Sequence, residues 1–270
     1  MTQLPTWEAN LTVFGPIKTE RVQSFKVFKA FHHDNPFYSD ISLSNVNYGL
    51  TATVTAFAST SEYANKAALL FFGKMLDTLS LKIRQPIFLS FSSENPIRIK
   101  PYSVRRIIEK DEWKTAFQES RLLNEEEPTF LRALGWYRKG QYTEDPFDKF
   151  LAYWNSIEIT ATKYHTPTPQ TQNGSKNQIW ECFKTLWGDC ADWPIIQGNE
   201  DWIKDNYEIR TNIAHGLTPI TVDEVEKIVN KIEELEKVAH NFLANWREKE
   251  LSIKDHLSSL LEHIGVEHIA

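Results

Sequence analysis

The first part of the chain, to about residue 60, shows the alternating apolar and polar positions of β structure. Between residues 48 and 58, apolar side chains alternate with glycine and threonine, which is the pattern of a strand with one buried face. Shorter runs rich in β-forming residues, at 12–16 and 22–28, predict two further strands. Asn35-Pro36 and the serine- and asparagine-rich stretch 39–47 predict the loops between strands.

The spacing of apolar residues changes to a helical period near Ser59. Ser59 and Glu62 match a capping box, and a helix is predicted to continue to Leu79 because apolar residues recur three and four positions apart. Strand-like segments follow at 81–83, 87–91 and 97–99. These elements predict an α+β domain with a small, mostly antiparallel sheet and one helix, in which no chemical motif is evident.

A charge-rich segment, residues 109–128, separates this region from a second one. The segment ends in Glu125-Glu126-Glu127-Pro128, which predicts a stop of regular structure because proline cannot continue a helix. We therefore predict an α+β domain of unknown role over residues 1–120 and a helical domain over residues 121–270.

Apolar residues at helical spacing recur throughout the second region and predict a series of helices. Asp145 as N-cap, with Pro146 in the first helical position, marks one start, and Thr221 with Glu224 caps the longest helix. The predicted helices lie around residues 130–137, 145–163, 179–187, 199–215, 221–246 and 252–264. An all-α, up-and-down bundle is the simplest arrangement for amphipathic helices joined mostly by short links.

Composition narrows the class of protein. Hydrophobic residues make up 41% of 270 residues, enough for a proper core. The net charge of −6 argues against broad, non-specific nucleic-acid binding but permits a local basic site. The N-terminus shows no secretory signal, and the longest apolar run, residues 67–72, is far too short to span a membrane. Cys182 and Cys190 fit no zinc or redox spacing, so a soluble cytoplasmic protein with reduced thiols and no membrane partner is predicted.

Two charged residues fall on apolar faces of the predicted helices. Arg210 lies on the same helical face as Tyr207 and Ala214, and Glu158 lies on the same face as Trp154. Because a guanidinium inside a bundle needs an anionic partner, we predict that Arg210 and Glu158 meet there.

The end of the Arg210 helix carries a histidine. Gly216 suits the left-handed position that ends a helix, so His215 is predicted at the carbonyl end, where partial negative charge favours an imidazolium. Metal-free RNA cleavage needs a base, an acid and positive charge at one phosphate. One arginine and one histidine are half of such a set, and two copies across a twofold axis complete it, so a homodimer is predicted.

The seven residues from Arg210, Arg-Thr-Asn-Ile-Ala-His-Gly, resemble the R-x4-6-H signature of the HEPN superfamily. Residues 134–140 and 150–158 resemble the helices before that signature in its ApeA-like branch. The resemblance covers the C-terminal half, from Pro128 onward. Where the superfamily commonly has Asn, Asp or His directly after the arginine, this chain has Thr211, a difference that concerns catalysis more than fold.

The resemblance implies a metal-independent endoribonuclease without a cofactor, which uses paired motifs in a cleft between two domains. Arg210 would stabilise the phosphate and His215 would transfer protons, and the residues that would support them are Glu158, Thr211, Asn212, Asn155 and Tyr207. The expected partners are an RNA substrate, a second copy of the chain and a regulatory protein. A sensor domain before a HEPN effector is similar to bacterial antiviral-defence and toxin-type proteins.

Two other functions fit the sequence. The Arg210–Glu158 pair can be only an internal strut, with His215 a helix cap, in a non-catalytic protein that dimerises or docks a partner. A small-molecule or nucleotide sensor acting through the N-terminal domain is the third function, although no phosphate loop or nucleotide fingerprint supports it.

Other side chains fit structural roles better than chemical ones. His32-His33-Asp34 lacks a third ligand group at a supporting spacing, which favours a loop over a metal site. Lysines on the long helix alternate with glutamates, as on a solvated face: Lys227, Lys231 and Lys237. Four tryptophans could stack on nucleic-acid bases: Trp180, Trp187, Trp193 and Trp202. Helical spacing favours a place in the core for Trp187 and Trp202.

Overall fold

The computed structural model describes residues 5–26, 37–91, 104–219 and 221–253. By its internal contacts the chain divides into two compact units, Met1–Ser120 and Arg121–Ala270. Within the described residues, no helix combines the length and the apolar character needed to cross a bilayer.

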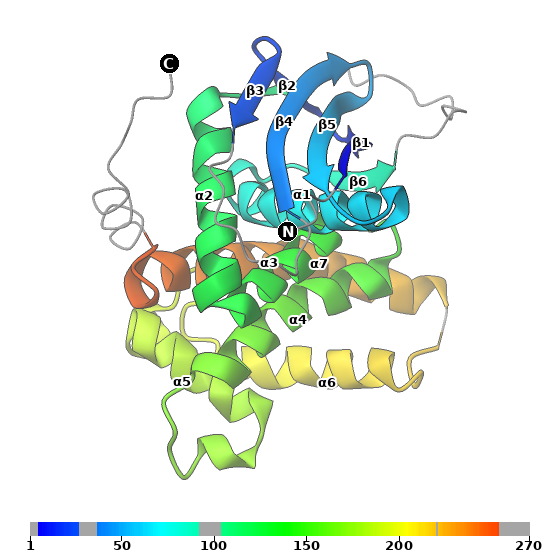
Figure 1. Cartoon of the computed structure of the whole chain (residues 1–270). Helices are drawn as coiled ribbons and strands as arrows, with labels where there is room; N and C mark the ends of the chain where they lie inside the picture. Colours follow the sequence, from blue (N-terminus) through cyan, green and yellow to red (C-terminus); the bar gives the residue numbers. More distant parts are fainter. Residues whose placement is uncertain (1–4, 27–36, 92–103, 220, 254–270) are drawn as a thin grey trace. The chain divides into compact units, whose positions relative to one another are not determined.

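The first unit is built on an antiparallel five-stranded sheet in the order β3-β4-β5-β1-β6 (Figure 1). A separate parallel pair joins β2 to β7. This arrangement confirms the predicted small, mostly antiparallel sheet, while the strand predicted at 97–99 lies outside the described residues. The strands are β1 (Thr6–Phe14), β2 (Ile17–Thr19), β3 (Gln23–Lys26), β4 (Phe37–Val46), β5 (Gly49–Phe57), β6 (Phe88–Phe91) and β7 (Arg106–Ile108).

The alternation that predicted β5 is confirmed by its burial. Leu50, Ala52 and Val54 are each 0% exposed, and the threonines between them are partly exposed. The buried face packs on helix α1 (Ser61–Ile83), which contributes Phe72 and Met75 to the same core. A strand with one buried face therefore has the period that the sequence shows.

The loop predicted over 39–47 is wrong, because this stretch belongs to β4. Ile41 and Leu43 are 2% and 0% exposed, so apolar side chains alternate with serines along the strand. Ser44 Oγ lies 2.6 Å from Thr51 Oγ1 on the neighbouring strand β5. Serine and asparagine signal turns only when no partner strand satisfies their backbone groups, and here both edges of β4 are paired.

Both predicted limits of α1 need correction. The N-cap is Thr60, whose hydroxyl accepts a hydrogen bond from Tyr63 N–H at 3.2 Å, so the capping box predicted for Ser59 and Glu62 does not form. Residues 81–83, predicted as a strand, are the last turn of the helix, where Leu81 and Ile83 are buried in the core. Packing thus extended the helix past the point where its apolar period suggested an end.

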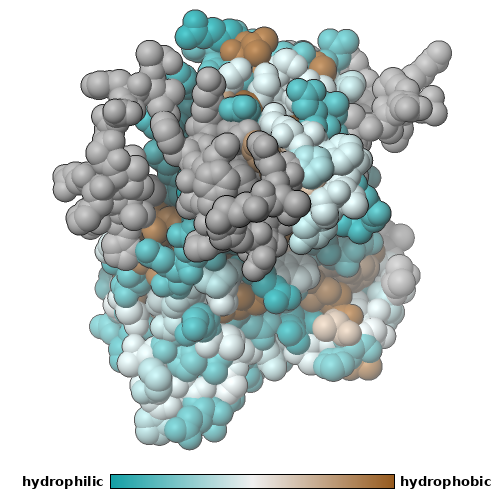
Figure 2. All heavy atoms as spheres, viewed as in Figure 1, coloured by the Kyte–Doolittle hydropathy of each residue, from teal (hydrophilic) through white to brown (hydrophobic). Residues whose placement is uncertain are grey.

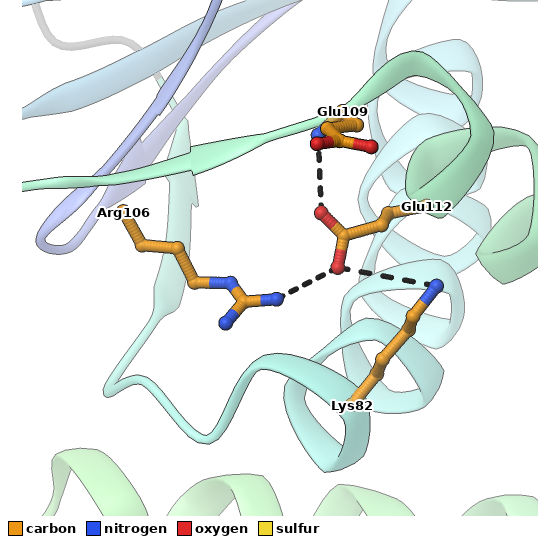
Figure 3. Close-up of polar contacts among 4 residues, drawn as sticks. All are labelled: Lys82, Arg106, Glu109 and Glu112. Carbon is orange, nitrogen blue, oxygen red and sulfur yellow. Dashed lines mark hydrogen bonds and ion pairs between the residues drawn. The ribbon is translucent and has the colours of Figure 1, made fainter.

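The charge-rich segment after residue 109 forms a helix, α2 (Lys110–Glu126), that the sequence did not predict. In the first unit its buried apolar side chains are Trp113, Ala116 and Phe117. Its start is fixed by Glu112, which accepts hydrogen bonds from Arg106 NH2 at 2.8 Å and Glu109 N–H at 3.1 Å (Figure 3). Lys82 Nζ lies 3.9 Å from the same carboxylate, so Glu112 ties the ends of α1 and β7 to α2.

The second unit is a helical bundle in which α4 packs against α3, α5, α6 and α7 (Figure 1). The predicted caps are confirmed, because Asp145 accepts from Asp148 N–H at 2.9 Å and Thr221 accepts from Glu224 N–H at 3.3 Å. Of the predicted last helix, the part from residue 254 lies outside the described residues. The helices are α3 (Pro128–Tyr142), α4 (Pro146–Tyr164), α5 (Ser175–Trp187), α6 (Trp202–Ala214) and α7 (Val222–Asn245), with short turns η1 (Thr171–Asn173), η2 (Cys190–Asp192) and η3 (Trp246–Glu250).

Aromatic residues fill the core of the bundle. Trp202 and Trp193 are each 1% exposed, which confirms the core role of Trp202. Neither ring is accessible enough to stack on a nucleic-acid base. Trp180 packs edge-on against Trp193 with ring centroids 4.6 Å apart, and the partly buried Trp187 packs on Phe183 at 4.8 Å. On the face drawn in Figure 2, hydrophobic residues form small separate groups among hydrophilic ones. The large apolar side chains of this unit that are exposed are Tyr142, Ile195, Leu217 and Val229.

Candidate functional site

Arg210 on α6 meets Glu158 on α4. Its Nε donates a hydrogen bond to Glu158 Oε2 at 3.1 Å, and its NH2 also lies 3.1 Å from that oxygen. The side chains are 29% and 15% exposed. The prediction that these two charges meet is therefore confirmed, but the pair lies at the edge of the bundle and not deep inside it.

The apolar stripe predicted around Arg210 is wrong in its second half. Only Trp202, Ile203 and Asn206 are buried on α6, while Tyr207 is half-buried and Ala214 is exposed. The first turns of α6 are anchored by Trp202, whose ring centroid lies 6.2 Å from that of Trp154 on α4. Beyond them the helix runs out along the surface, where a long charged side chain can keep part of its head in water.

Ser175, at the start of α5, completes the contacts of Glu158. Its Oγ donates to Glu158 Oε1 at 2.7 Å, so both carboxylate oxygens accept a hydrogen bond. No pattern in the sequence pointed to Ser175, because its approach to Glu158 depends on how α5 packs on α4. Gly174 precedes it with φ 105°, a backbone conformation that favours glycine and sets the entry of the chain into α5.

A groove of about 510 Å³ opens beside the ion pair. Five of its lining residues come from α4 and recur three and four positions apart, so they form one stripe along that helix. Thr129 from α3 and Arg210 from α6 complete the lining. The α4 residues are Asn155, Glu158, Ile159, Thr162 and Lys163.

Most polar side chains of this groove have no protein partner. Among the residues that the structure describes, no hydrogen bond or ion pair engages the side chains of Thr129, Asn155, Thr162 or Lys163. Arg210 uses Nε and NH2 on Glu158, and its NH1 has no polar partner within the same described part of the chain. The groove therefore presents several donors and one carboxylate that is already satisfied.

His215 is the C-cap of α6, as predicted. Its backbone N–H donates to Thr211 O at 3.0 Å, and Gly216 follows with φ 66°. The His215 side chain is exposed and does not line the groove that contains Arg210. Five residues along a helix correspond to a rotation of about 140°, so one copy of the chain does not direct both side chains at one point.

The supporting residues fall into different environments. Asn155 lines the groove, whereas Asn212 is exposed at the end of α6. Tyr207 lies under Lys176, whose Nζ is 5.2 Å from the ring centroid. Thr211 Oγ1 is buried and has no hydrogen-bond partner among the described residues. The structure thus places Asn155 beside Glu158 and Arg210, whereas no hydrogen bond among the described residues joins the side chain of Thr211 or Asn212 to the ion pair.

The other sequence candidates contribute no site. His32-His33-Asp34 lies outside the described residues, and the described part of the chain holds no group of three His, Cys, Asp or Glu side chains suited to a metal. Burial raises the pKa of Cys182 to about 12, and burial also raises that of Cys190, so neither thiol is ionised near neutral pH. Lys227 and Lys237 form exposed ion pairs with Glu224 and Glu233, as predicted for a solvated face.

Comparisons with known proteins address the helical unit. The family described as Methylamine utilization protein MauJ has a model that matches residues 133–259. The match runs from within α3 to beyond α7 and includes Glu158, Ser175, Arg210 and His215. A search of curated proteins and a search of solved structures each found no match. The helical unit is therefore similar to the MauJ family.

Proposed function

We propose that this protein is a metal-independent endoribonuclease of the HEPN type, active as a homodimer through its helical unit. The observation that carries the proposal is the guanidinium of Arg210, fixed by Glu158 beside a groove of unpaired donors, five residues before an exposed helix-end histidine. An oriented arginine and an accessible histidine supply half of the acid, base and positive charge that metal-free phosphodiester cleavage needs, and a second copy of the chain would supply the other half.

In this proposal Arg210 stabilises the charge that develops on the phosphate. Glu158 holds Nε and NH2 through Oε2, and Ser175 holds the carboxylate through Oε1, so the guanidinium is aimed before substrate binds. NH1 stays available to a phosphate oxygen. Because Glu158 already holds the guanidinium in place, Arg210 needs little reorganisation during the reaction.

His215 serves as acid or base. An imidazole can donate or accept a proton, and His215 lies exposed at the carbonyl end of α6. Because Arg210 and His215 lie on different sides of α6, the phosphate that Arg210 binds would meet His215 of a second copy across a twofold axis. A dimer is thus part of the proposed mechanism. The first unit would regulate or target the nuclease in a defence or toxin-type setting.

The description of the matched family names methylamine utilization. A groove that contains Lys163 and Arg210 repels a methylammonium cation, since its one carboxylate is already engaged by Ser175 and Arg210. The charge of the groove therefore favours an anionic ligand over the amine that the family description mentions.

Cleavage of RNA in EDTA tests the proposal directly. The dimer is incubated with structured and unstructured RNA, and His215→Ala and Arg210→Ala are each expected to lower the rate at least about 100-fold. His165→Ala is the matched control, because His165 is also a helix C-cap and its Nδ1 lies 2.9 Å from Ala161 O. Absence of cleavage across a broad RNA panel, or equal rates for His215→Ala and His165→Ala, would refute the nuclease.

A non-catalytic dimerisation or docking protein is the second candidate. It is favoured by the complete pairing of Glu158, which fits an internal strut, and by the separation of Arg210 from His215 within one chain. In that case Arg210→Ala lowers the melting temperature, while His215→Ala changes neither stability nor any activity. Loss of RNA cleavage in a His215→Ala variant that folds normally would exclude this second candidate.

A further inference from the structure

The groove beside Arg210 carries a net positive charge in a protein whose net charge is −6. Lys163 and Arg210 are its cations, and Glu158 is its one anion. Lys163 has no ion-pair partner among the described residues, in contrast to Lys227 and Lys237, which pair with glutamates on their own helix. A lysine left unpaired beside a groove is available to an anion from outside the chain.

The carboxylate of Glu158 does not oppose such an anion strongly. Ser175 donates to Oε1 and Arg210 donates to Oε2, so both oxygens already accept a hydrogen bond from the protein. Apart from the apolar Ile159, the other lining residues carry groups that can donate a hydrogen bond: Thr129, Thr162, Asn155, Lys163 and Arg210 NH1. Several free donors around one satisfied acceptor select an anion with many acceptor oxygens.

The shape of the groove further limits the class of anion that would fit it. From Asn155 to Lys163 the lining follows α4 for about 12 Å, at 1.5 Å per residue. Ile159 lies in the middle of this stripe and is partly exposed, which offers an apolar contact between two polar ends. A ligand with successive anionic groups and less polar atoms between them, such as a sugar-phosphate chain, matches two cations, Lys163 and Arg210, with Ile159 in the same lining.

We propose that the groove binds the phosphate backbone of a nucleic-acid strand, and that Lys163 is a positioning residue for a phosphate that flanks the one at Arg210. This inference rests on the proposed function, because it assigns the substrate contacts of the same site. Lys163 supplies a point charge on a flexible stem, while the hydroxyls of Thr129 and Thr162 donate to phosphate oxygens. Lys163 touches no reacting atom and contributes to binding alone.

The test measures binding without chemistry. A fluorescent 2′-O-methyl oligoribonucleotide has no 2′-hydroxyl nucleophile, so its anisotropy reports affinity for the full-length protein. Lys163→Gln is expected to weaken binding about fivefold to tenfold and to lower the slope of log K against log salt by about 0.7. Lys149→Gln is the matched control, since Lys149 lies on the same helix outside the groove. Equal affinities and slopes for the two variants would overturn the proposal.

Two further measurements separate this inference from the proposed function. With cleavable RNA, Lys163→Gln is expected to raise KM with little change in kcat, whereas His215→Ala lowers kcat. If no RNA is cleaved but the affinity for the oligonucleotide still depends on Lys163, the proposed nuclease activity is refuted and the phosphate-binding groove is supported. If AMP or inorganic phosphate binds with the same dependence on Lys163 and the oligonucleotide does not bind, the groove serves a free phosphate compound and the strand assignment fails.

Discussion

The two faces of helix α4 differ in what they contribute. The inner face is fully buried and apolar, with Phe150, Trp154, Ile157 and Ala161 each 0% exposed. The groove face, which runs from Asn155 to Lys163, is partly exposed, and no residue that the structure describes engages its hydroxyl, amide and ammonium groups. Burial of the inner face stabilises the bundle, whereas the groove face contributes little to stability and carries the side chains proposed to bind the substrate. Substitutions on one helix can therefore separate folding from function.

The largest effect is expected on the inner face. Trp154→Ala removes a fully buried ring that packs against Trp202, and should lower the free energy of unfolding by about 3–5 kcal/mol. Denaturant unfolding followed by tryptophan fluorescence measures the loss. Ile159→Ala is the control on the groove face, where a partly exposed side chain should cost about 1 kcal/mol. Equal losses would show that the two faces of α4 are buried alike.

A smaller effect is expected where the two faces meet, at the Arg210–Glu158 pair. Arg210→Ala should cost about 1–2 kcal/mol, less than a fully buried pair, because solvent reaches both side chains. Ser175→Ala should cost about 1 kcal/mol through the lost hydrogen bond to Glu158 Oε1. Thermal and denaturant unfolding measure both. A loss above about 4 kcal/mol for Arg210→Ala would mean that the pair is a buried strut, in favour of the non-catalytic alternative.

The smallest effect is expected from pH. Burial raises the pKa of Cys182 to about 12, from an ordinary value of 9.0. The neutral thiol is thus favoured in the folded state, and its contribution to stability is present below the ordinary pKa and is lost as pH rises toward the folded value. Between about pH 8 and about pH 9.7 the wild type should lose about 1 kcal/mol more stability than Cys182→Ala does.

Thiol labelling provides the control for that pH experiment. Cys182 packs toward α4, with its Sγ 3.9 Å from Ala161 O, whereas Cys190 is partly exposed. Iodoacetamide at neutral pH should therefore modify Cys190 first and reach Cys182 only after unfolding. Equal alkaline destabilisation of the wild type and Cys182→Ala would show that other groups, among them the buried Tyr164 hydroxyl, dominate that pH range.

Local sequence signals succeeded where a few neighbouring residues decide the structure. The caps at Asp145 and Thr221, the left-handed Gly216 and the alternation along β5 depend on local backbone geometry, and all were predicted correctly. The errors arose where packing outweighed local preference. The serine-rich stretch 39–47 became a strand because β3 and β5 pair with both of its edges.

For the candidate site, the sequence by itself determined which residues carry charge and on which helical face they lie. That was enough to predict that Glu158 and Arg210 meet, although they are far apart in the chain and the apolar stripe covers only the first turns of α6, because a charge with little access to water needs a partner of opposite sign. Tertiary structure alone decided the contact of Ser175, the partial exposure of the ion pair and the groove with its unpaired Lys163. These depend on how α4, α5 and α6 pack, and packing is set by side-chain shape across the whole core, which no local pattern encodes.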